Sequence, residues 1–151
     1  MAAIQALSDQ ISQLDRQLRQ QVAPLAPSLL SLPGCGPLTA AKLIAETAGV
    51  APEACFAMHA GVAPVPVSSG RTDRHRLSRG GNRQLNAALH RIAITQLRLP
   101  GPGQSYYQRR RAQGDGTGEA VRALKRRIAR AVYQHLKQAQ QASVTAAPPA
   151  A

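Results

Sequence analysis

Residues 32–46 read LPGCGPLTAAKLIAE, and their order of glycines, prolines and helix-forming residues predicts the local fold of the first half of the chain. Two glycines separated by one residue, Gly34 and Gly36, permit a tight turn of the backbone. The residues that follow them, Leu38 to Glu46, have good helix propensity. The stretch therefore predicts a short helix that begins near Ser28, a tight turn, and a second helix.

This turn between two helices resembles the helix-hairpin-helix motif, which binds the DNA backbone without reading base sequence. Backbone amides at the start of the second helix, with the helix dipole behind them, suit a phosphate. The candidate DNA-binding residues of this motif are Gly34, Gly36, Thr39 and Lys42. An ordinary pair of helices joined by a glycine turn is the alternative interpretation.

The segment before this turn carries an apolar seam of the coiled-coil type. Its spacings alternate between three and four residues over residues 2–22, and Pro24 and Pro27 end the pattern. The seam is long for so small a chain, so we expect it to pair with a helix of the same chain or of a second copy. Its members are Ile4, Leu7, Ile11, Leu14, Leu18, Val22 and Leu25.

The rest of the chain also favours helices. They are predicted over residues 51–59, with Phe56 and Met58 as core candidates, and over 82–99, 104–113 and 119–140. Pro64 and Pro66 make residues 62–67 extended, and a basic loop over 71–81 follows.

The predicted fold is mainly α, a helix-hairpin-helix plus a helical bundle. A long coiled-coil-like helix (1–26) precedes a domain over 27–140 in which a short extended segment carries a serine pair. Residues 141–151 are expected to form a disordered tail.

The charge is concentrated in one part of the chain. The 151 residues hold 19 Lys and Arg against 7 Asp and Glu, a net charge of +12. Residues 71–130 contain fourteen Arg and Lys125 against three acids, which is also +12, so the remainder is neutral. Guanidinium groups bind phosphate bidentately, and so dense a basic stretch indicates a nucleic-acid partner. On the last helix, Lys125 is expected on the polar side with the arginines.

Composition also excludes several classes of protein. Seven scattered acids leave little material for a multi-carboxylate site, and we expect no metal site in these residues. Cys35 and Cys55 lack metal-ligand spacing and are expected to be reduced thiols. There is no run of 18 apolar residues and no signal-peptide pattern, so we expect no membrane contact and a cytoplasmic bacterial protein associated with the nucleoid.

Further motifs follow the glycine turn in a distinctive order. They are Ala60-Gly61-Val62-Ala63-Pro64, then Ser69-Gly70, then Ser78-Arg79-Gly80-Gly81-Asn82-Arg83-Gln84-Leu85. Together with residues 32–41 they resemble the C-terminal domain of the insertion-sequence 110/116/902 transposases, the RNA-guided serine recombinases. The resemblance covers about residues 28 to 137, and the leading helix is similar to the coiled coil that precedes this domain in the family.

The resemblance implies a serine nucleophile that forms a covalent phosphoserine link to DNA. Ser69 is the residue that matches, and Ser68 is its near alternative. Cations close behind it would neutralise the phosphate oxygens. These cations, which are also candidate DNA-binding residues, are Arg71, Arg74, Arg76, Arg79 and Arg83.

The resemblance implies that full-length members of the family have two catalytic parts. The first part is a ribonuclease-H-like domain with four metal-binding carboxylates, and it has no counterpart in this sequence. The chain therefore resembles a truncated or separately encoded C-terminal half. The implied partners are DNA, a guide RNA and a ribonuclease-H-like domain, in cis or in trans. No cofactor is expected within this chain, and Mg²⁺ is expected only with that missing domain.

The sequence leaves open a rival nucleophile, the base for Ser69 and two other functions. Tyr106 or Tyr107 is a rival nucleophile, and His75 is a candidate base for Ser69. A non-catalytic nucleic-acid-binding module built on the helix-hairpin-helix is the second function. A helical assembly protein that acts through residues 2–22 is the third.

Overall fold

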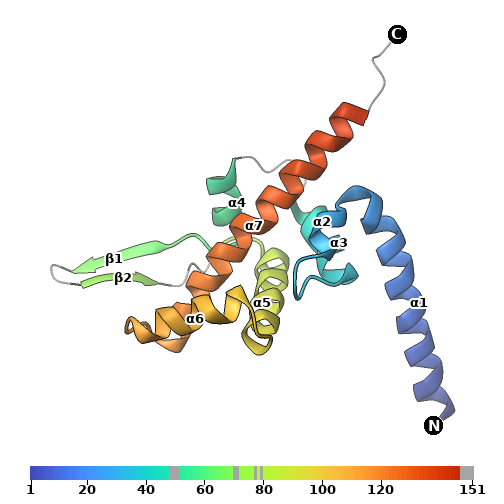
Figure 1. Ribbon diagram of the computed structural model, residues 1–151, viewed down its shortest axis with the longest axis horizontal. Coiled ribbons are helices and arrows are strands. Elements are labelled where there is room, and N and C mark those ends of the chain that lie inside the picture. The colour runs from blue at the N-terminus through green and yellow to red at the C-terminus, as the bar shows by residue number, and fades with distance from the viewer. Residues whose placement is uncertain (48–51, 70–71, 77, 79, 147–151) are drawn as a thin grey trace.

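The computed structural model describes residues 1–47, 52–69, 72–76, 78 and 80–146. Within these ranges the chain is mainly α-helical, as predicted, with one antiparallel two-stranded sheet (Figure 1). The elements are α1 (Ala2–Leu25), α2 (Pro27–Leu30), α3 (Pro37–Thr47), α4 (Glu53–His59), β1 (Val65–Ser69), β2 (Thr72–Arg76), α5 (Arg83–Arg98), α6 (Pro102–Ala112) and α7 (Thr117–Ala146).

Helix α5 lies at the centre of the packing and contacts α3, α6 and α7. The helical spacing predicts a buried stripe of six residues; five of them are at most 2% exposed, and the sixth, Leu97, is partly buried. The stripe packs against α7 and belongs to the same core cluster as Phe56 of α4. Aliphatic burial of this kind stabilises a fold by about 25 cal/mol per Å². The five buried residues of the stripe are Leu85, Ala88, Leu89, Ile92 and Ala93.

Helix α1 carries its apolar seam away from this core. Ile4, Leu7, Ile11 and Leu14 are 58–67% exposed, and Val22 is the buried residue of the helix. Figure 1 shows α1 diverging from the body of the molecule on the side away from the β-hairpin. No other described element of the chain covers the outer part of the seam, so a partner helix from the same chain is not found there.

Four local predictions were wrong or incomplete. Residues 72–76 of the predicted basic loop form β2, because backbone pairing with β1 needs no apolar side chains. Met58 is 68% exposed, because α4 packs through Phe56 and Ala57. Lys125 is 7% exposed, because it lies beside Leu124 on the inner side of α7. Helix α7 continues to Ala146, so residues 141–146 are helical.

None of the described helices is long and apolar enough to cross a membrane. In the same part of the chain, no three His, Cys, Asp or Glu side chains gather as potential metal ligands.

Candidate nucleic-acid interface

The base of the β-hairpin, which we call the hairpin root, consists of residues 59–62 before β1 and 80–82 after β2. Two glycines, one in each segment, bring the two backbones close together there. Gly61 has φ +64° and Gly81 has φ +92°, conformations that favour glycine. A Cβ on Gly81 would lie 2.5 Å from the His59 carbonyl oxygen and 2.8 Å from the Gly61 nitrogen. A Cβ on Gly61 would lie 2.6 Å from the Gly80 oxygen. These motif glycines therefore bring the segment before β1 and the segment after β2 into direct backbone contact.

Two asparagines lock this root onto the helical core. Asn82 is the N-cap of α5, where its side chain accepts hydrogen bonds from the backbone nitrogens of Gln84 (2.8 Å) and Leu85 (3.1 Å). Its amide also donates to Glu46 of α3. One turn later, the amide of Asn86 donates to the carbonyl oxygens of Ala60 (2.9 Å) and Gly61 (3.2 Å). The polar residues of the motif thus have structural roles at the base of the hairpin.

The hairpin carries the predicted serine pair at its far end. In the backbone register Ser69 pairs with Thr72, Ser68 with Asp73, and Val65 with Arg76. Residues 70 and 71 lie between the strands and outside the described residues, so the position of Arg71 is not described; the same holds for Arg79. Arg74 pairs with Val67 in the backbone register, about 7 Å of strand from Ser69.

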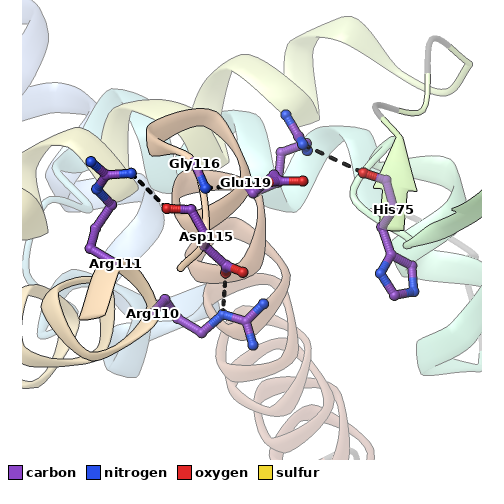
Figure 2. A network of polar contacts seen from close by, with 7 residues as sticks. His75, Arg110, Arg111, Asp115, Gly116 and Glu119 are labelled. Carbon is purple, nitrogen blue, oxygen red and sulfur yellow. Dashed lines mark hydrogen bonds and ion pairs between the residues drawn. The ribbon is translucent and has the colours of Figure 1, made fainter. Parts of the chain in front are cut away.

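The candidate base His75 lies nearer the root than the serines do. It pairs with Pro66, three residues before Ser69, and is therefore about 10 Å from it along the strand. His75 is exposed, and its carbonyl oxygen accepts a hydrogen bond from Arg122 at 3.5 Å (Figure 2). The structure does not bring this imidazole next to Ser69.

A cleft of about 320 Å³ opens beside the hairpin root. Its walls come from residues 61–64, the end of β2, α6, the turn after α6 and the first half of α7. Apolar walls from Val62, Pro64 and Ala123 face two acidic residues, Asp115 and Glu119, and a larger set of cationic side chains. Those cations are Arg76, Arg110, Arg122, Lys125 and Arg126.

Several of the arginines around this cleft are held by partners within the chain. Arg110 pairs with Asp115 at 2.5 Å, and Arg111 donates to the Asp115 carbonyl at 2.6 Å (Figure 2). Arg126 pairs with Glu53 of α4 at 2.6 Å. The hydrogen bond from Arg126 lowers the pKa of the Glu53 carboxyl, and the charges of Arg126 and Arg130 lower it further. These contacts tie α4, α6 and α7 together.

Three cations of the cleft have no carboxylate partner among the described residues: Arg76, Arg122 and Lys125. Arg76 is exposed at the end of β2, and Arg122 is partly buried on α7. Lys125 is 93% buried, and its ammonium donates to the Asn86 side-chain oxygen at 2.7 Å. Burial lowers the pKa of this ammonium. The cleft therefore keeps unpaired positive charge at its rim and at its floor.

The glycine turn before α3 is packed rather than open. Gly34 has φ +87°, and a Cβ there would lie 2.8 Å from Thr95 Cβ and 3.1 Å from the Ile92 oxygen of α5. Thr39 is buried, and Lys42 donates to Gln84 Oε1 at 3.0 Å. Gly36 alone faces open space, since nothing lies within 4 Å of its Cβ position. Arg83, the first residue of α5, is exposed.

Both tyrosines of α6 are partly buried, and Tyr106 is flanked by cations. The guanidinium carbon of Arg127 lies 5.0 Å from the centre of its ring, and that of Arg109 lies 5.3 Å from it. Such cation–π contacts stabilise packing between helices. Tyr106 thus joins α6 to α7 at the edge of the cleft.

Sequence reasoning missed Lys125, Arg122 and Asn86 as members of a common site. A signal for Lys125 was present, because it lies four residues after Val121 and three before Ile128, on the apolar stripe of α7. Nothing in the sequence signalled that Asn86 contacts both Lys125 and the carbonyl groups of the hairpin root.

Comparison with known proteins gives consistent matches. Residues 26–108 match the family described as Transposase IS116/IS110/IS902 family. The insertion element IS116 uncharacterized 44.8 kDa protein of Streptomyces clavuligerus is 34% identical over 128 residues, 81% of this chain and 32% of that protein. The insertion element IS110 uncharacterized 43.6 kDa protein of Streptomyces coelicolor is 32% identical over 143 residues, 90% of this chain and 35% of that protein. The chain spans about a third of the length of these relatives.

Proposed function

Because the chain belongs to the IS116/IS110/IS902 transposase family, we propose that it binds DNA during transposition in the bacterial nucleoid and supplies the serine that attacks the DNA backbone. Ser69 is the proposed nucleophile, and Ser68 is the neighbouring alternative. The observation that carries the proposal is the convergence of the motifs Ala60–Pro64 and Gly80–Asn86 at the hairpin root. They anchor the strand that ends at Ser69.

The anchored strand suits the chemistry that a serine nucleophile requires. The Ser69 oxygen would form a bond to phosphorus while one P–O ester bond of the DNA breaks, and the departing sugar hydroxyl would take up a proton. Because the phosphoserine link keeps the energy of a phosphoester bond, the reverse attack by a hydroxyl would rejoin DNA and restore the serine. Cations at the hairpin would neutralise the phosphate oxygens during both steps.

The proton acceptor for Ser69 is proposed to come from outside this chain. His75 is about 10 Å away along the strand. Among the described residues, no three His, Cys, Asp or Glu side chains gather as ligands for the Mg²⁺ that the family resemblance implies. A ribonuclease-H-like domain, in cis or in trans, would provide carboxylates and the metal, and a guide RNA would select the target.

The test is formation of a covalent protein–DNA adduct by the full chain. The chain is combined with a ribonuclease-H-like domain of a family member, guide RNA, Mg²⁺ and target DNA, and adducts that survive denaturing electrophoresis are counted. We expect Ser69→Ala to abolish the adduct and Ser68→Ala, the matched control one residue away, to retain it. An adduct that persists in Ser69→Ala would refute the assignment, and loss only in Ser68→Ala would move it to the neighbour.

A second candidate function is a non-catalytic nucleic-acid-binding module. The open space at Gly36, just before α3 begins, favours it, because backbone amides at a helix start can bind phosphate. This function predicts that DNA binds but that no adduct forms in any reconstitution. It also predicts that binding depends on the turn before α3 more than on the hairpin.

The exposed seam of α1 gives a third element of the proposal, association with a second copy of the chain. The exposed part of the seam, from Ile4 to Leu14, has the spacing of a coiled-coil helix. Light scattering on the full chain should give a dimer mass or larger, and Ile11→Asn should shift it to the monomer. A monomeric wild-type chain at micromolar concentration would contradict this association.

A further inference from the structure

Lys125 occupies an unusual position for a lysine, because its side chain is 93% buried yet it has no carboxylate partner among the described residues. An ammonium has three N–H donors, and the hydrogen bonds of this part of the chain give it one acceptor, Asn86 Oδ1. Burying an unpaired charge is costly in free energy. A buried lysine of this kind either has a structural role that offsets the cost in free energy, or it forms part of a site that binds an anion.

A purely structural role explains little of this arrangement. Asn86 already holds the hairpin root through its amide, which donates to Ala60 and Gly61. The oxygen of that amide needs one donor, and a neutral side chain would supply it without a buried charge. The extra charge at this position therefore calls for another explanation.

The surroundings of Lys125 supply that explanation. It lines the floor of the cleft, and Arg76 and Arg122 line the same space from β2 and from the preceding turn of α7. Neither arginine has a carboxylate partner in the described ranges, whereas Arg110 and Arg126 of the same cleft are paired with Asp115 and Glu53. Arg110 and Arg126 are thus neutralised by carboxylates, whereas these three cations have only neutral acceptors or none among the described residues, although the Glu119 carboxylate also lines the cleft.

We infer that the cleft between the hairpin root, α6 and α7 binds a phosphodiester group of a nucleic-acid strand, with Lys125 at its floor and Arg76 and Arg122 at its rim. The inference rests on the proposed function only for the identity of the anion as nucleic acid. A phosphate is small enough for the 320 Å³ cleft, and its two free oxygens match guanidinium and ammonium donors.

The cleft and the proposed nucleophile are spaced for a single strand to reach both. Arg76 pairs with Val65, four residues before Ser69, a separation of about 13 Å along the hairpin. Stacked nucleotides rise about 3.4 Å each, so the two places are about four nucleotides apart. The cleft would hold the strand on one side of the attacked phosphate.

The test compares the salt dependence of binding among single-charge variants of α7. Binding of the full chain to labelled duplex DNA, and to a single-stranded RNA, is measured by fluorescence anisotropy from 50 to 300 mM KCl, a range chosen so that phosphate contacts change affinity measurably. Arg122→Gln and Lys125→Met are compared with Lys137→Gln, which removes an exposed charge from the same helix. Far-UV circular dichroism and thermal melting confirm folding.

We expect Arg122→Gln and Lys125→Met each to weaken binding about fivefold to tenfold at 100 mM salt and to reduce the salt slope by about one. Lys137→Gln should change affinity less than twofold. If Arg122→Gln and Lys125→Met weaken binding to DNA, to RNA or to both more than Lys137→Gln does, the cleft is supported, and the nucleic acid affected is the one that the cleft binds. Equal effects of all three variants on both nucleic acids would overturn the inference.

Two further controls keep the result interpretable. If Lys125→Met does not fold, Arg122→Gln decides the question, because Arg122 is partly exposed and holds no ion pair among the described residues. The Ser69 assignment is tested separately by formation of the covalent adduct, whereas the cleft, which does not include Ser69, is tested by affinity and salt slope. Failure of the cleft and failure of the Ser69 assignment are therefore seen in different measurements.

Discussion

The two glycine turns of the chain differ in what surrounds them. The turn before α3 is pressed against α5, with Thr95 and Ile92 filling the space beside Gly34 and with Gln96 donating to the Pro33 carbonyl at 3.1 Å. The crossing of Gly61 and Gly81 is equally tight, but it borders a cleft with unpaired cations. Glycine in both places permits close packing, and only at the hairpin root does that packing create a charged recess.

A glycine motif and a basic stretch therefore do not by themselves identify a phosphate site. The sequence predicts DNA contacts for the turn before α3 and for the basic segment 71–83, which includes Gly81 of the second crossing. In the structure Lys42 donates to Gln84 much as Lys125 donates to Asn86, but Lys125 lines one cleft together with Arg76 and Arg122. The gathering of several cations around one cleft, rather than the presence of a basic residue, separates the two regions.

The largest expected effect comes from breaking the hairpin root. Gly81→Ala should lower the free energy of unfolding by about 2–4 kcal/mol, because the new Cβ meets backbone atoms that cannot move independently and the φ of +92° is unfavourable for alanine. Gly80→Ala is the matched control, since nothing lies within 4 Å of its Cβ position. Urea unfolding followed by circular dichroism measures both. Equal stability of the two variants would show that the crossing does not hold the root.

A smaller effect on stability is expected from an arginine that is already paired. Arg126→Gln should lower the free energy of unfolding at pH 7 by about 1–2 kcal/mol, because it removes the partly buried ion pair between α7 and α4. DNA affinity should fall by no more than Lys137→Gln produces. A loss of binding as large as that of Arg122→Gln would show that cations with a carboxylate partner contribute to binding as much as cations without one.

The same ion pair predicts a pH dependence with a defined sign. The folded chain lowers the pKa of Glu53, so the pair stabilises the fold above the ordinary pKa of a glutamate and loses that contribution as the pH falls through the lowered value. The stabilities of wild type and Arg126→Gln should therefore converge in acid. Urea unfolding at pH 7 and at successively lower pH checks this, and a constant difference would contradict it.

The smallest perturbation probes whether the turn before α3 is closed. Cys35, within that turn, is 3% exposed and burial raises its pKa to about 11, whereas Cys55 is exposed. A thiol reagent at pH 7.5 should label Cys55 quickly and Cys35 only on unfolding, because the thiolate is the reactive form. Mass spectrometry of the labelled peptides measures both rates. Fast labelling of Cys35 would show that the turn opens to solvent.

Much of the fold follows from local patterns in the sequence. Helix α5, predicted over 82–99, and the long helix α1 have strong helical spacing. Strand β2 was missed because its residues, Thr72-Asp73-Arg74-His75-Arg76, have no apolar alternation, and pairing with β1 alone makes them a strand.

The candidate site was harder to predict, because it depends on contacts between distant segments. The sequence indicates Ser69 and Arg76 through motif order, and it locates the excess charge in residues 71–130. It does not indicate which arginines find carboxylates, since Glu53 lies outside that stretch and reaches Arg126 only in the folded chain. Lys125 joins the cleft through Asn86, 39 residues away.

One paired measurement tests most directly whether the hairpin root, and not the glycine turn, binds nucleic acid. Arg122→Gln and Lys42→Gln each remove one positive charge. Their dissociation constants are measured for the same DNA duplex at one salt concentration, so any difference between them reflects the position of the charge and not its number. We predict about fivefold to tenfold weaker binding for Arg122→Gln and less than twofold for Lys42→Gln. The reverse order would contradict the interface described here and favour the non-catalytic module.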